Sequence, residues 1–354
     1  MQNSNKKNNI LIITQRVDRN DPILGFFHRW VEEFSKHYKK VTVICLEKGE
    51  YNLPDNVEVK SLGKENRDNR FLYVVRFYRY VIGKLFSKEK PKRIFVHMNE
   101  IYILLLIPLW IVRKVMGIKL LWWKAHGHLS LLSKIIYHFV DVVVTSSKIG
   151  FNINTARRKV VGQGIDIDRF DGSGRKNSNT KIIVAVGRFS KTKRFEDLIE
   201  AARLLKQEGK SFKVRILGVT ASDEYEKYLK SLINKYNLKE IVIFEKPISN
   251  EHMPEFYKRA DIIVNMSETD SLDKVVLEAM ACGVIPIVAT RSYKLILEQF
   301  NLYVEKRDVK SLVETLKKVL SLSEEEKNRL RKDMRSIVEK KHGMVNLVEK
   351  IANL

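Results

Sequence analysis

The sequence predicts an α/β protein with two doubly wound parallel sheets, each covered by helices on both faces. Three observations support this fold class. The 354 residues suffice for two domains of about 150 residues each. Short apolar segments of strand length alternate with amphipathic segments of helix length, which is typical of parallel sheets. The stretch Asp171–Thr180 holds no apolar residue, separates two sets of strand-like segments, and is expected to be a linker or surface loop.

Short apolar segments predict the strands of both sheets. In the first half they are Ile10–Thr14, Val41–Leu46, Val57–Ser61, Arg93–His97, Leu120–Lys124 and Asp141–Thr145. In the second half they are Lys181–Val186, Lys213–Leu217, Ile241–Phe244, Asp261–Asn265 and Ile285–Ala289. In such sheets ligands bind at the carboxyl ends of the strands, so the loops that follow these segments are where we expect a site.

The tail of the sequence predicts three helices, which separate near Leu322 and His342. We expect a first domain at residues 1–165 and a second at residues 166–339. The last helix, at about residues 340–354, is expected to pack back on the first domain.

An apolar run at Ile101–Val112 reads IYILLLIPLWIV. It is about 12 residues long before Arg113 and Lys114 follow, whereas a helix that spans a bilayer needs about 20 apolar residues. We therefore interpret the run as a core helix packed on the sheet.

The composition is basic, with a net charge of +23. Residues 1–170 hold 30 basic and 15 acidic residues, so most of the excess lies in the first half. A basic half predicts an acidic partner, which is a phosphate-bearing substrate, an anionic membrane or a nucleic acid; the alternative is a charge that serves solubility alone. Cys45 and Cys282 are too few for a disulfide scaffold or a zinc site. The polar first nine residues do not resemble a secretory signal, so we expect a cytoplasmic protein.

The segment Arg70–Phe86 predicts an unusually aromatic helix, followed by the basic stretch Ser87–Arg93. Basic residues beside exposed aromatic ones favour reversible docking on an anionic membrane surface. The alternative is that the aromatic side chains pack on the sheet and the lysines form a solvated rim.

One motif follows the predicted strand Asp261–Asn265. Asp270 precedes a predicted helix at Asp273–Ala281, and Glu278 lies inside that helix. Eight residues of helical rise span about 12 Å, so the two acids can hold both ends of an extended ligand. Free backbone amides at the helix N-terminus suit a diphosphate between those ends. The alternative is that Asp270 caps the helix and Glu278 is a surface acid.

A second motif follows the predicted strand Lys181–Val186. Gly187 turns the chain, and Arg188 and Lys193 come next, ahead of a predicted helix at Phe195–Lys206. The loop is neither a P-loop nor GxGxxG. It places two cations at the same sheet edge as the two acids, where arginine can hold a phosphate with two hydrogen bonds and lysine adds a point charge.

Together the two motifs resemble the nucleotide-binding half of the retaining GT-B glycosyltransferases of group 1 (family four). That family has GR-x3-5-K-G in one loop and later an acid, seven residues, a glutamate and AMACG-x-P-V. This sequence reads GRFSKTKR and DSLDKVVLEAMACGVIPIV, and Gly162–Asp166 is similar to the family's hinge segment. The resemblance covers most of residues 160–320 and implies the GT-B fold, in which two Rossmann-like domains face a central cleft.

The resemblance also implies roles for individual residues. Arg188 and Lys193 would bind the donor diphosphate and stabilise the charge on the leaving nucleotide. Glu278 would accept hydrogen bonds from the ribose, and Asp270 from the sugar. The other donor-binding residues that the resemblance implies are Ser271, Leu272, Lys274 and Val275.

The sequence departs from the family pattern at three places. Asp270 stands where the family usually has glutamate, and Ser271–Asp273 replaces its GFG. Gln163 replaces the hinge asparagine. These changes alter the expected sugar pocket, while the nucleotide end keeps the family pattern.

The first half resembles the family only loosely. His126 follows a predicted strand and is the residue we expect to touch the transferred sugar, with His128 as the alternative. Gly25 resembles one glycine of the family's loop near the diphosphate. Asp166 and Asp168 read as a DxD metal motif, but their place in the hinge segment argues against metal binding, and no metal or other cofactor is expected.

The sequence thus predicts a metal-independent, retaining glycosyltransferase that uses a nucleotide-sugar donor. Its acceptor would be lipid-linked or a cell-surface glycan precursor, met at the inner face of a membrane. The main alternative is a non-catalytic GT-B protein that binds anionic membrane or nucleic acid through its basic first half. A GT-B epimerase or phosphorylase is a further alternative, although no environment for a pyridoxal phosphate lysine is recognisable. Nucleic acid is the least favoured partner, because the basic residues are scattered.

Overall fold

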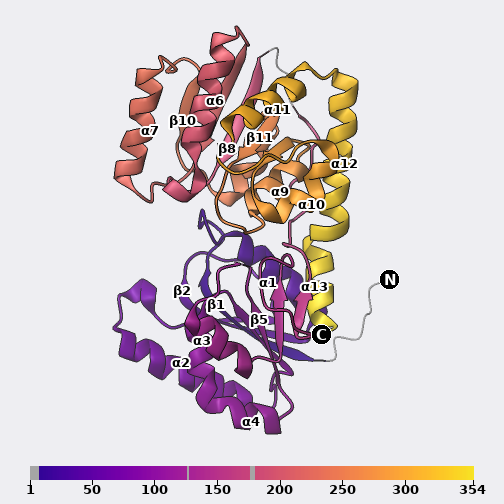
Figure 1. Cartoon of the computed structure of the whole chain (residues 1–354). Coiled ribbons are helices and arrows are strands. Elements are labelled where there is room, and N and C mark those ends of the chain that lie inside the picture. The colour runs from indigo at the N-terminus through magenta and orange to yellow at the C-terminus, as the bar shows by residue number, and fades with distance from the viewer. Residues whose placement is uncertain (1–7, 126, 176–179) are drawn as a thin grey trace. The chain divides into compact units, whose positions relative to one another are not determined.

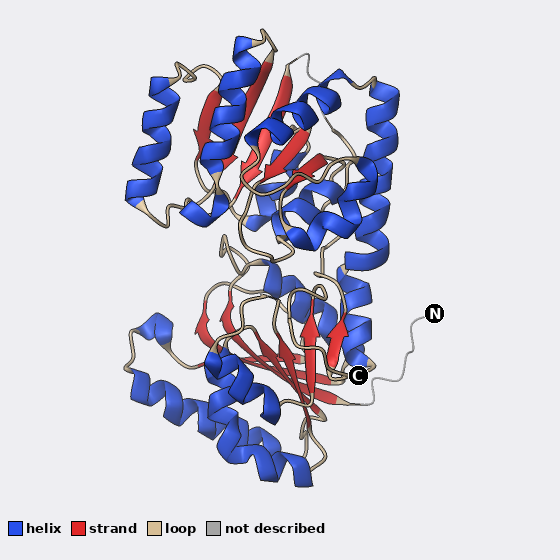
Figure 2. Cartoon of the chain, viewed as in Figure 1, coloured by secondary structure: helices blue, strands red, loops and turns tan. Residues whose placement is uncertain are grey.

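The computed structural model describes residues 8–125, 127–175 and 180–354. The chain forms two compact units, coloured along the sequence in Figure 1. The first runs to Gly164 and also takes in Met344–Leu354, and the second is Ile165–Gly343. Figure 2 shows one sheet in each unit. The predicted class, two parallel α/β units, is confirmed.

In the described part of the chain, the first unit has a seven-stranded parallel sheet with the order β3-β2-β1-β4-β5-β6-β7. Its strands are β1 (Asn9–Val17), β2 (Lys40–Lys48), β3 (Val57–Ser61), β4 (Arg93–His97), β5 (Lys119–Trp123), β6 (Val142–Thr145) and β7 (Arg158–Val160). The chain builds outward from β1 in both directions, as in a doubly wound sheet. The sequence did not predict β7, because its three residues include two cations and lie at the partly exposed edge.

Two helix layers cover this sheet. Alternate residues of each strand point to opposite faces, so Ile10 and Ile12 belong to one apolar cluster and Leu11 and Ile13 to the other. One face is covered by α1 (Phe26–His37) and α13 (Met344–Ala352). The other face carries α2 (Arg70–Leu85), α3 (Glu100–Leu106), α4 (Trp110–Val115) and α5 (Leu131–Ile136).

The prediction of one core helix at Ile101–Val112 is wrong in two respects. The segment is divided into α3, a 3₁₀ turn at Ile107–Leu109 and α4. Pro108 lies at this division, where its missing N–H and its ring do not suit a helix interior. The segment also does not lie wholly in the core, since Ile101, Leu104 and Ile111 are exposed.

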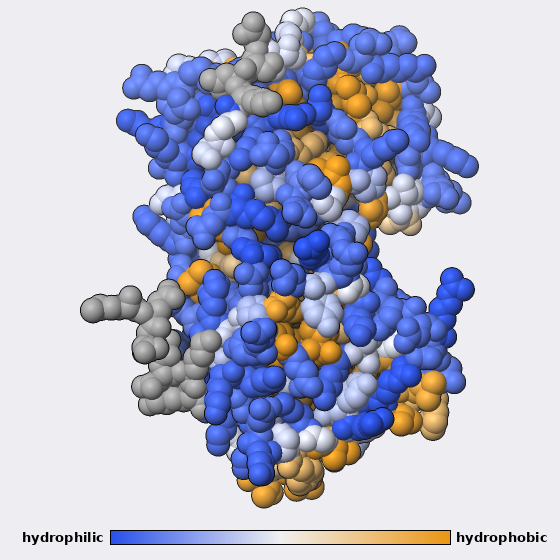
Figure 3. Space-filling model, turned by 180° about the vertical axis from the view of Figure 1, so that it is seen from behind, coloured by the Kyte–Doolittle hydropathy of each residue, from blue (hydrophilic) through white to orange (hydrophobic). Residues whose placement is uncertain are grey.

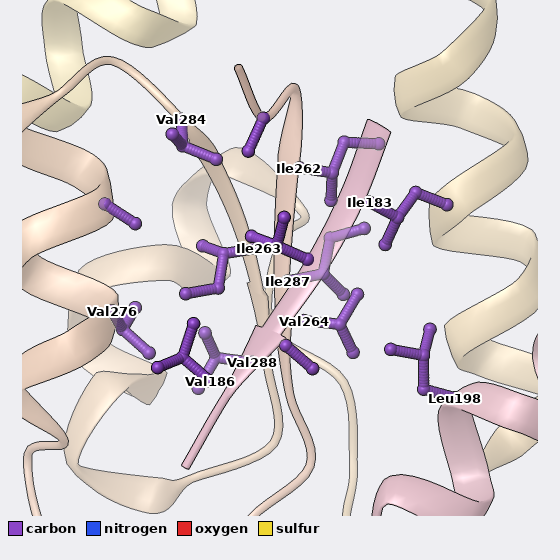
Figure 4. Close-up of a cluster of buried hydrophobic side chains, with 14 of the residues drawn as sticks. Ile183, Val186, Leu198, Ile262, Ile263, Val264, Val276, Val284, Ile287 and Val288 are labelled. Atoms are coloured by element: carbon purple, nitrogen blue, oxygen red, sulfur yellow. The ribbon is translucent and has the colours of Figure 1, made fainter. Parts of the chain in front are cut away.

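The second unit has a five-stranded parallel sheet in the residues described, with the order β10-β9-β8-β11-β12. Its strands are β8 (Lys181–Val186), β9 (Phe212–Leu217), β10 (Val242–Glu245), β11 (Ile262–Asn265) and β12 (Ile285–Val288). Its helices are α6 (Phe195–Gln207), α7 (Asp223–Lys235), α8 (Met253–Tyr257), α9 (Lys274–Ala281), α10 (Lys294–Leu297), α11 (Val309–Ser321) and α12 (Glu324–His342). Figure 4 shows the core at its centre, where Ile263 and Ile287 of the sheet lie near Val276 of α9.

The stretch Asp171–Thr180 is not a linker between the units, because the chain leaves the first unit at Gly164. Arg175 lies within the second unit, where its Nη2 is 3.1 Å from Asp261 Oδ1. At Gly164 itself φ is +71°, and a Cβ atom would lie 2.6 Å from the Trp30 ring. The Trp30 indole N–H donates to the Gly164 carbonyl at 3.0 Å, so the ring cannot move away without losing this bond. Only glycine fits there.

Within the part of the chain that is described, none of the helices combines the length and the apolar character that crossing a membrane requires.

Candidate functional site

The candidate site lies in the second unit at the carboxyl ends of β8 and β11, which are neighbours in the sheet. The strands are parallel, so the loops that follow them meet at one edge. The first loop leads from Val186 to α6, and the second leads from Asn265 to α9. The backbone joins the two loops, since the Glu268 N–H donates to the Thr192 carbonyl at 2.9 Å.

Lys193 of the first loop and Asp273 of the second form an ion pair, with 2.6 Å between Lys193 Nζ and Asp273 Oδ2. Asn265 Nδ2 donates to the same carboxylate oxygen at 2.9 Å, and Ser271 Oγ donates to the other oxygen at 3.0 Å. Tyr293 holds the Asp273 backbone through its hydroxyl, which donates to the carbonyl at 2.6 Å. Asp273 is therefore fixed from four sides.

The Asp273 carboxylate stays charged in this environment. Burial alone would raise its pKa, but the charge of Lys193 and the hydrogen bonds from Lys193, Asn265 and Ser271 leave the pKa below its ordinary value. The negative charge sits immediately before the first residue of α9, where the helix N-terminus favours anions. In the structure, a carboxylate of the protein itself thus neutralises the lysine that the sequence assigns to a diphosphate.

Arg188 follows β8 and is exposed. Among the described residues no ion pair of Arg188 is found. The two cations predicted to bind the diphosphate therefore lie on one loop but have different surroundings: Lys193 is paired with Asp273, and Arg188 faces solvent.

Asp270 also has a partner, because its Oδ1 lies 2.8 Å from Lys306 Nζ. Lys306 Nζ donates as well to the Glu268 carbonyl at 2.8 Å, and the Ser292 hydroxyl donates to the Asp270 carbonyl. Glu268 forms its own ion pair with Arg307 at 2.5 Å. Lys306 and Arg307, which follow Val304, thus neutralise two acids of the loop between β11 and α9.

Among the other predicted donor-binding residues, Leu272 is buried in the core and Val275 packs against it. Ser271 is buried and hydrogen-bonded to Asp273 and Thr269. The apolar side chains of Leu272 and Val275 therefore hold the loop on the sheet, and a ligand could meet Leu272 only through its backbone, whereas the side chain of Val275 is partly exposed.

Glu278 lies one helical turn after Lys274 on α9, and its side chain is 3% exposed. Asn250 hydrogen-bonds to Glu278, and Arg169 donates to the Asn250 carbonyl at 2.5 Å and to its side-chain oxygen. Burial raises the pKa of Glu278, while the charges of Lys274 and Arg169 oppose that shift. Burial likewise lowers the pKa of Lys274 against the charge of Glu278. Glu278 is thus a buried acid in a polar cluster and not a surface acid.

The two acids of the hinge segment do not act together. Asp166 is buried and accepts a hydrogen bond from the Arg169 N–H at 3.4 Å, whereas Asp168 is exposed. Within the described residues, no group of three or more His, Cys, Asp or Glu side chains suits a metal ion.

The predicted residues of the first half lie in the first unit. Gly25 precedes α1, and a Cβ atom there would lie 2.5 Å from the Asp21 carbonyl oxygen, so the tight loop requires glycine whatever binds near it. His126 lies outside the described residues. His128 is exposed in the loop between β5 and α5.

Sequence reasoning did not find the partners of the predicted residues. In the sequence, Asp273 stands out only because it replaces the last glycine of the family's GFG. An acid at this position, with Lys193 expected at the same sheet edge, was a signal for an ion pair between the two. Lys306 lies 36 residues after its partner Asp270, and Asn250 and Arg169 belong to other loops than Glu278, so no local pattern pointed to these partners.

We predict that Asp273→Asn increases the affinity for UDP and for inorganic pyrophosphate about tenfold. The substitution keeps the shape of the side chain but removes a negative charge and frees Lys193 for a phosphate. Isothermal titration calorimetry measures both affinities. The matched control is Glu268→Gln, which removes the same charge from the same loop and frees only Arg307. Weaker binding by Asp273→Asn would contradict this prediction and would mean that Asp273 positions Lys193 for its ligand.

Comparison with known proteins shows what the second unit is similar to. Residues 166–337 match the model of the family described as glycosyl transferases group 1. Over 152 residues the chain is 29% identical to a D-inositol 3-phosphate glycosyltransferase of Arthrobacter sp. (strain FB24), covering 40% of this chain and 35% of that protein. Over 134 residues it is 31% identical to the putative colanic acid biosynthesis glycosyltransferase WcaL of Escherichia coli (strain K12), covering 36% and 32%. The matched part of the chain thus spans about a third of the length of these curated relatives.

Solved structures extend the likeness in fold to both units. The structure of Alr3699/HepE from Anabaena in complex with UDP has a TM-score of 0.75 at 16% identity, covering 98% of each chain. At this identity the likeness concerns the fold alone, which is the GT-B type with two Rossmann-like units. The match of residues 166–337 adds a likeness in sequence: this part of the chain, which is most of the second unit, is similar to the glycosyl transferases of group 1.

Proposed function

We propose that this protein is a retaining glycosyltransferase that transfers a sugar from a nucleotide-sugar donor and needs no metal ion. One observation carries the proposal. Within the group 1 domain, Lys193 lies at the N-terminus of α9 and Glu278 lies buried in the same helix. This arrangement offers a cation for a diphosphate beside the start of α9 and an acid for a ribose hydroxyl within α9.

Lys193 and Arg188 bind the donor diphosphate in this proposal. As the bond between the sugar and the diphosphate breaks, negative charge grows on the leaving nucleotide. Two cations placed beforehand stabilise that charge in the transition state, and the amides at the start of α9 add to the effect. Donor binding requires Lys193 to exchange the Asp273 carboxylate for a phosphate, or to contact both.

Glu278 accepts hydrogen bonds from the ribose hydroxyls, and Asp270 accepts from the transferred sugar. Their pairing with Lys274 and Lys306 keeps each carboxylate beside a cation before the donor arrives. Ser271, Leu272, Lys274 and Val275 contribute backbone or side-chain contacts along the donor. In the first unit, His126, with His128 as the alternative, contacts the transferred sugar, and Gly25 lies near the diphosphate.

The relatives suggest where to begin with donor and acceptor. Alr3699/HepE has been solved with UDP and with UDP-glucose, so UDP-sugars are the first donors to test. WcaL is named for colanic acid biosynthesis, which supports a lipid-linked or cell-surface glycan precursor as the acceptor class. Such an acceptor would place the protein in the cytoplasm at the inner face of the membrane.

The second candidate function is a non-catalytic protein that binds anionic membrane or nucleic acid through its first half. The Lys193–Asp273 ion pair favours it, because a site whose lysine is neutralised binds a diphosphate less well. Hydrolysis of the donor separates the two candidates. A glycosyltransferase slowly releases the nucleotide from its own donor, and a non-catalytic protein does not.

We predict that Lys193→Ala and Arg188→Ala each reduce the transfer rate about 10²–10³-fold, because each removes charge stabilisation from the leaving group. Arg188 is exposed, so its removal should leave the melting temperature nearly unchanged, whereas Lys193→Ala leaves the Asp273 carboxylate without its cation and should lower the melting temperature. The assay is therefore run well below the melting temperature of each variant. Release of the nucleotide from a UDP-sugar measures the effect. Lys191→Ala is the matched control, since this exposed lysine belongs to the same loop. Full activity of Lys193→Ala would exclude the diphosphate assignment.

Glu278→Gln is expected to weaken UDP binding about 10- to 100-fold, which is the contribution of a hydrogen bond to a charged acceptor. Pyrophosphate has no ribose, so its binding should be unchanged by this variant. Lys193→Ala should weaken the binding of both. Calorimetry with the two ligands therefore tests the two ends of the site separately, and equal losses for UDP and pyrophosphate in Glu278→Gln would argue against a ribose contact.

We expect transfer and donor binding to survive EDTA, because Lys193, Arg188 and the start of α9 supply the positive charge that a metal ion would otherwise bring. The assay compares transfer rates before and after chelation. Loss of activity that Mn²⁺ or Mg²⁺ restores would refute metal independence and direct attention to Asp166 and Asp168.

A further inference from the structure

Helix α2 of the first unit is apolar on its solvent side. Phe71, Val75, Ile82 and Phe86 follow one another at helical spacing, and all four are exposed; Phe71 and Phe86 are 74% and 68% exposed. The opposite side of the helix, with Phe77 and Val81, packs on the sheet. A helix that covers a sheet in a water-soluble protein normally has a polar outer face, so this second apolar stripe is not explained by folding.

The neighbouring helices on the same face of the sheet repeat the pattern. Their exposed residues stand three or four positions apart within each helix. They are Ile101 and Leu104 of α3, Ile111 and Val115 of α4, and Leu131 and Ile135 of α5. We call the exposed apolar residues of α2, α3, α4 and α5 the α2–α5 face. Figure 3 shows hydrophobic side chains gathered at the end of the first unit where Figure 1 places α2 and α4.

The second unit provides a contrast. Its exposed large hydrophobic residues, within the described part of the chain, are Tyr228, Ile243 and Leu295, which lie on separate elements. The apolar surface is therefore a property of one helix layer and not of the whole protein.

The helix layer that carries the α2–α5 face is predominantly basic. Residues 70–140 hold 13 Lys and Arg against 2 acidic residues. Both acids are engaged, since Glu89 pairs with Lys84 at 3.0 Å and Glu100 pairs with Lys124 at 2.5 Å. Exposed basic residues flank the apolar stripes, among them Arg79, Lys88, Lys90, Lys92 and Lys134.

We propose that the α2–α5 face docks on a bilayer that contains anionic lipids, with its apolar side chains in the headgroup layer. The combination of positive charge and exposed apolar surface favours a bilayer over two other partners, a second copy of this chain and a nucleic acid. A second copy of this chain would bring the same positive charge and be repelled. A nucleic acid would satisfy the charge but would leave the Phe and Ile side chains without an apolar environment, whereas a bilayer meets both needs.

This inference deepens the proposed function, because it rests on the membrane location given there and names the surface that carries it. Each basic residue near an anionic leaflet contributes about fivefold to partitioning, and the apolar side chains add to it. The docking is reversible and weakens as salt rises.

The experiment is sedimentation of the full chain with vesicles, without donor or acceptor. Wild type should pellet with phosphatidylcholine vesicles that contain phosphatidylglycerol at low salt, and much less with phosphatidylcholine alone or at high salt. Two variants separate the contributions. Phe71→Ser with Phe86→Ser removes exposed apolar groups, and Arg79→Gln with Lys88→Gln and Lys90→Gln removes charge.

Matched controls come from the second unit. Leu295→Ser with Tyr228→Ser removes comparable exposed apolar groups, and Lys210→Gln with Lys227→Gln and Lys239→Gln removes the same charge from exposed lysines. We expect the charge variant of the α2–α5 face to lose about 100-fold in partitioning, the apolar variant to lose at least tenfold, and the controls to lose little.

Three results would overturn the inference. They are equal binding to neutral and anionic vesicles, equal losses in the face variants and their controls, and a wild-type dimer in analytical ultracentrifugation that Phe71→Ser with Phe86→Ser dissociates. UDP affinity, measured on the same samples, keeps the two proposals apart. A protein that binds UDP but not vesicles retains the proposed donor site and loses only the docking face, and vesicle binding without UDP binding gives the opposite outcome.

Discussion

Parallel pairing of β8 with β11 is the constraint on which the candidate site depends. Because the strands run in the same direction and lie side by side, the loops after Val186 and Asn265 must emerge at one edge. Residues about 80 positions apart in the sequence, Lys193 and Asp273, thereby come within 2.6 Å of each other. The apolar core beneath the two loops holds β8 and β11 together. The positions of Lys193 and Asp273 therefore depend on the packing of apolar residues that take no part in the chemistry.

Electrostatic balance distinguishes the two ends of this site. At the start of α9, Asp273 is a charged acid paired with Lys193. Burial raises its pKa, but the charge of Lys193 and the hydrogen bonds lower it by more, so the pKa lies below its ordinary value. One turn into the helix, Glu278 is an acid whose burial raises its pKa although a lysine is near. The two carboxylates therefore differ in how readily they take up a proton. At Asp273 the charge of Lys193 and the hydrogen bonds together outweigh the effect of burial on the pKa, whereas at Glu278 burial outweighs the charges of Lys274 and Arg169.

The fold and the identity of the site loops could be predicted from the sequence, because strand-length apolar segments and the two motifs are local patterns. The partners of the site residues could not, since Asp273 meets Lys193, and Lys306 meets Asp270, only through tertiary structure. The run at Ile101–Val112 shows a different limit. Its composition is that of a core helix, yet Pro108 divides it and several of its apolar residues face outward, which hydropathy alone does not reveal.

Helix α13 has a consequence for how the chain acquires its structure. Leu347, Val348 and Ile351 are buried in the core of the first unit, yet they follow the whole second unit in sequence. During synthesis the first sheet therefore leaves the ribosome with one patch of its apolar surface uncovered, and that patch stays open until residues 344–352 emerge. The first unit is therefore synthesised first but completes its core only when α13 has been synthesised. Its folding thus depends on translation of the whole second unit.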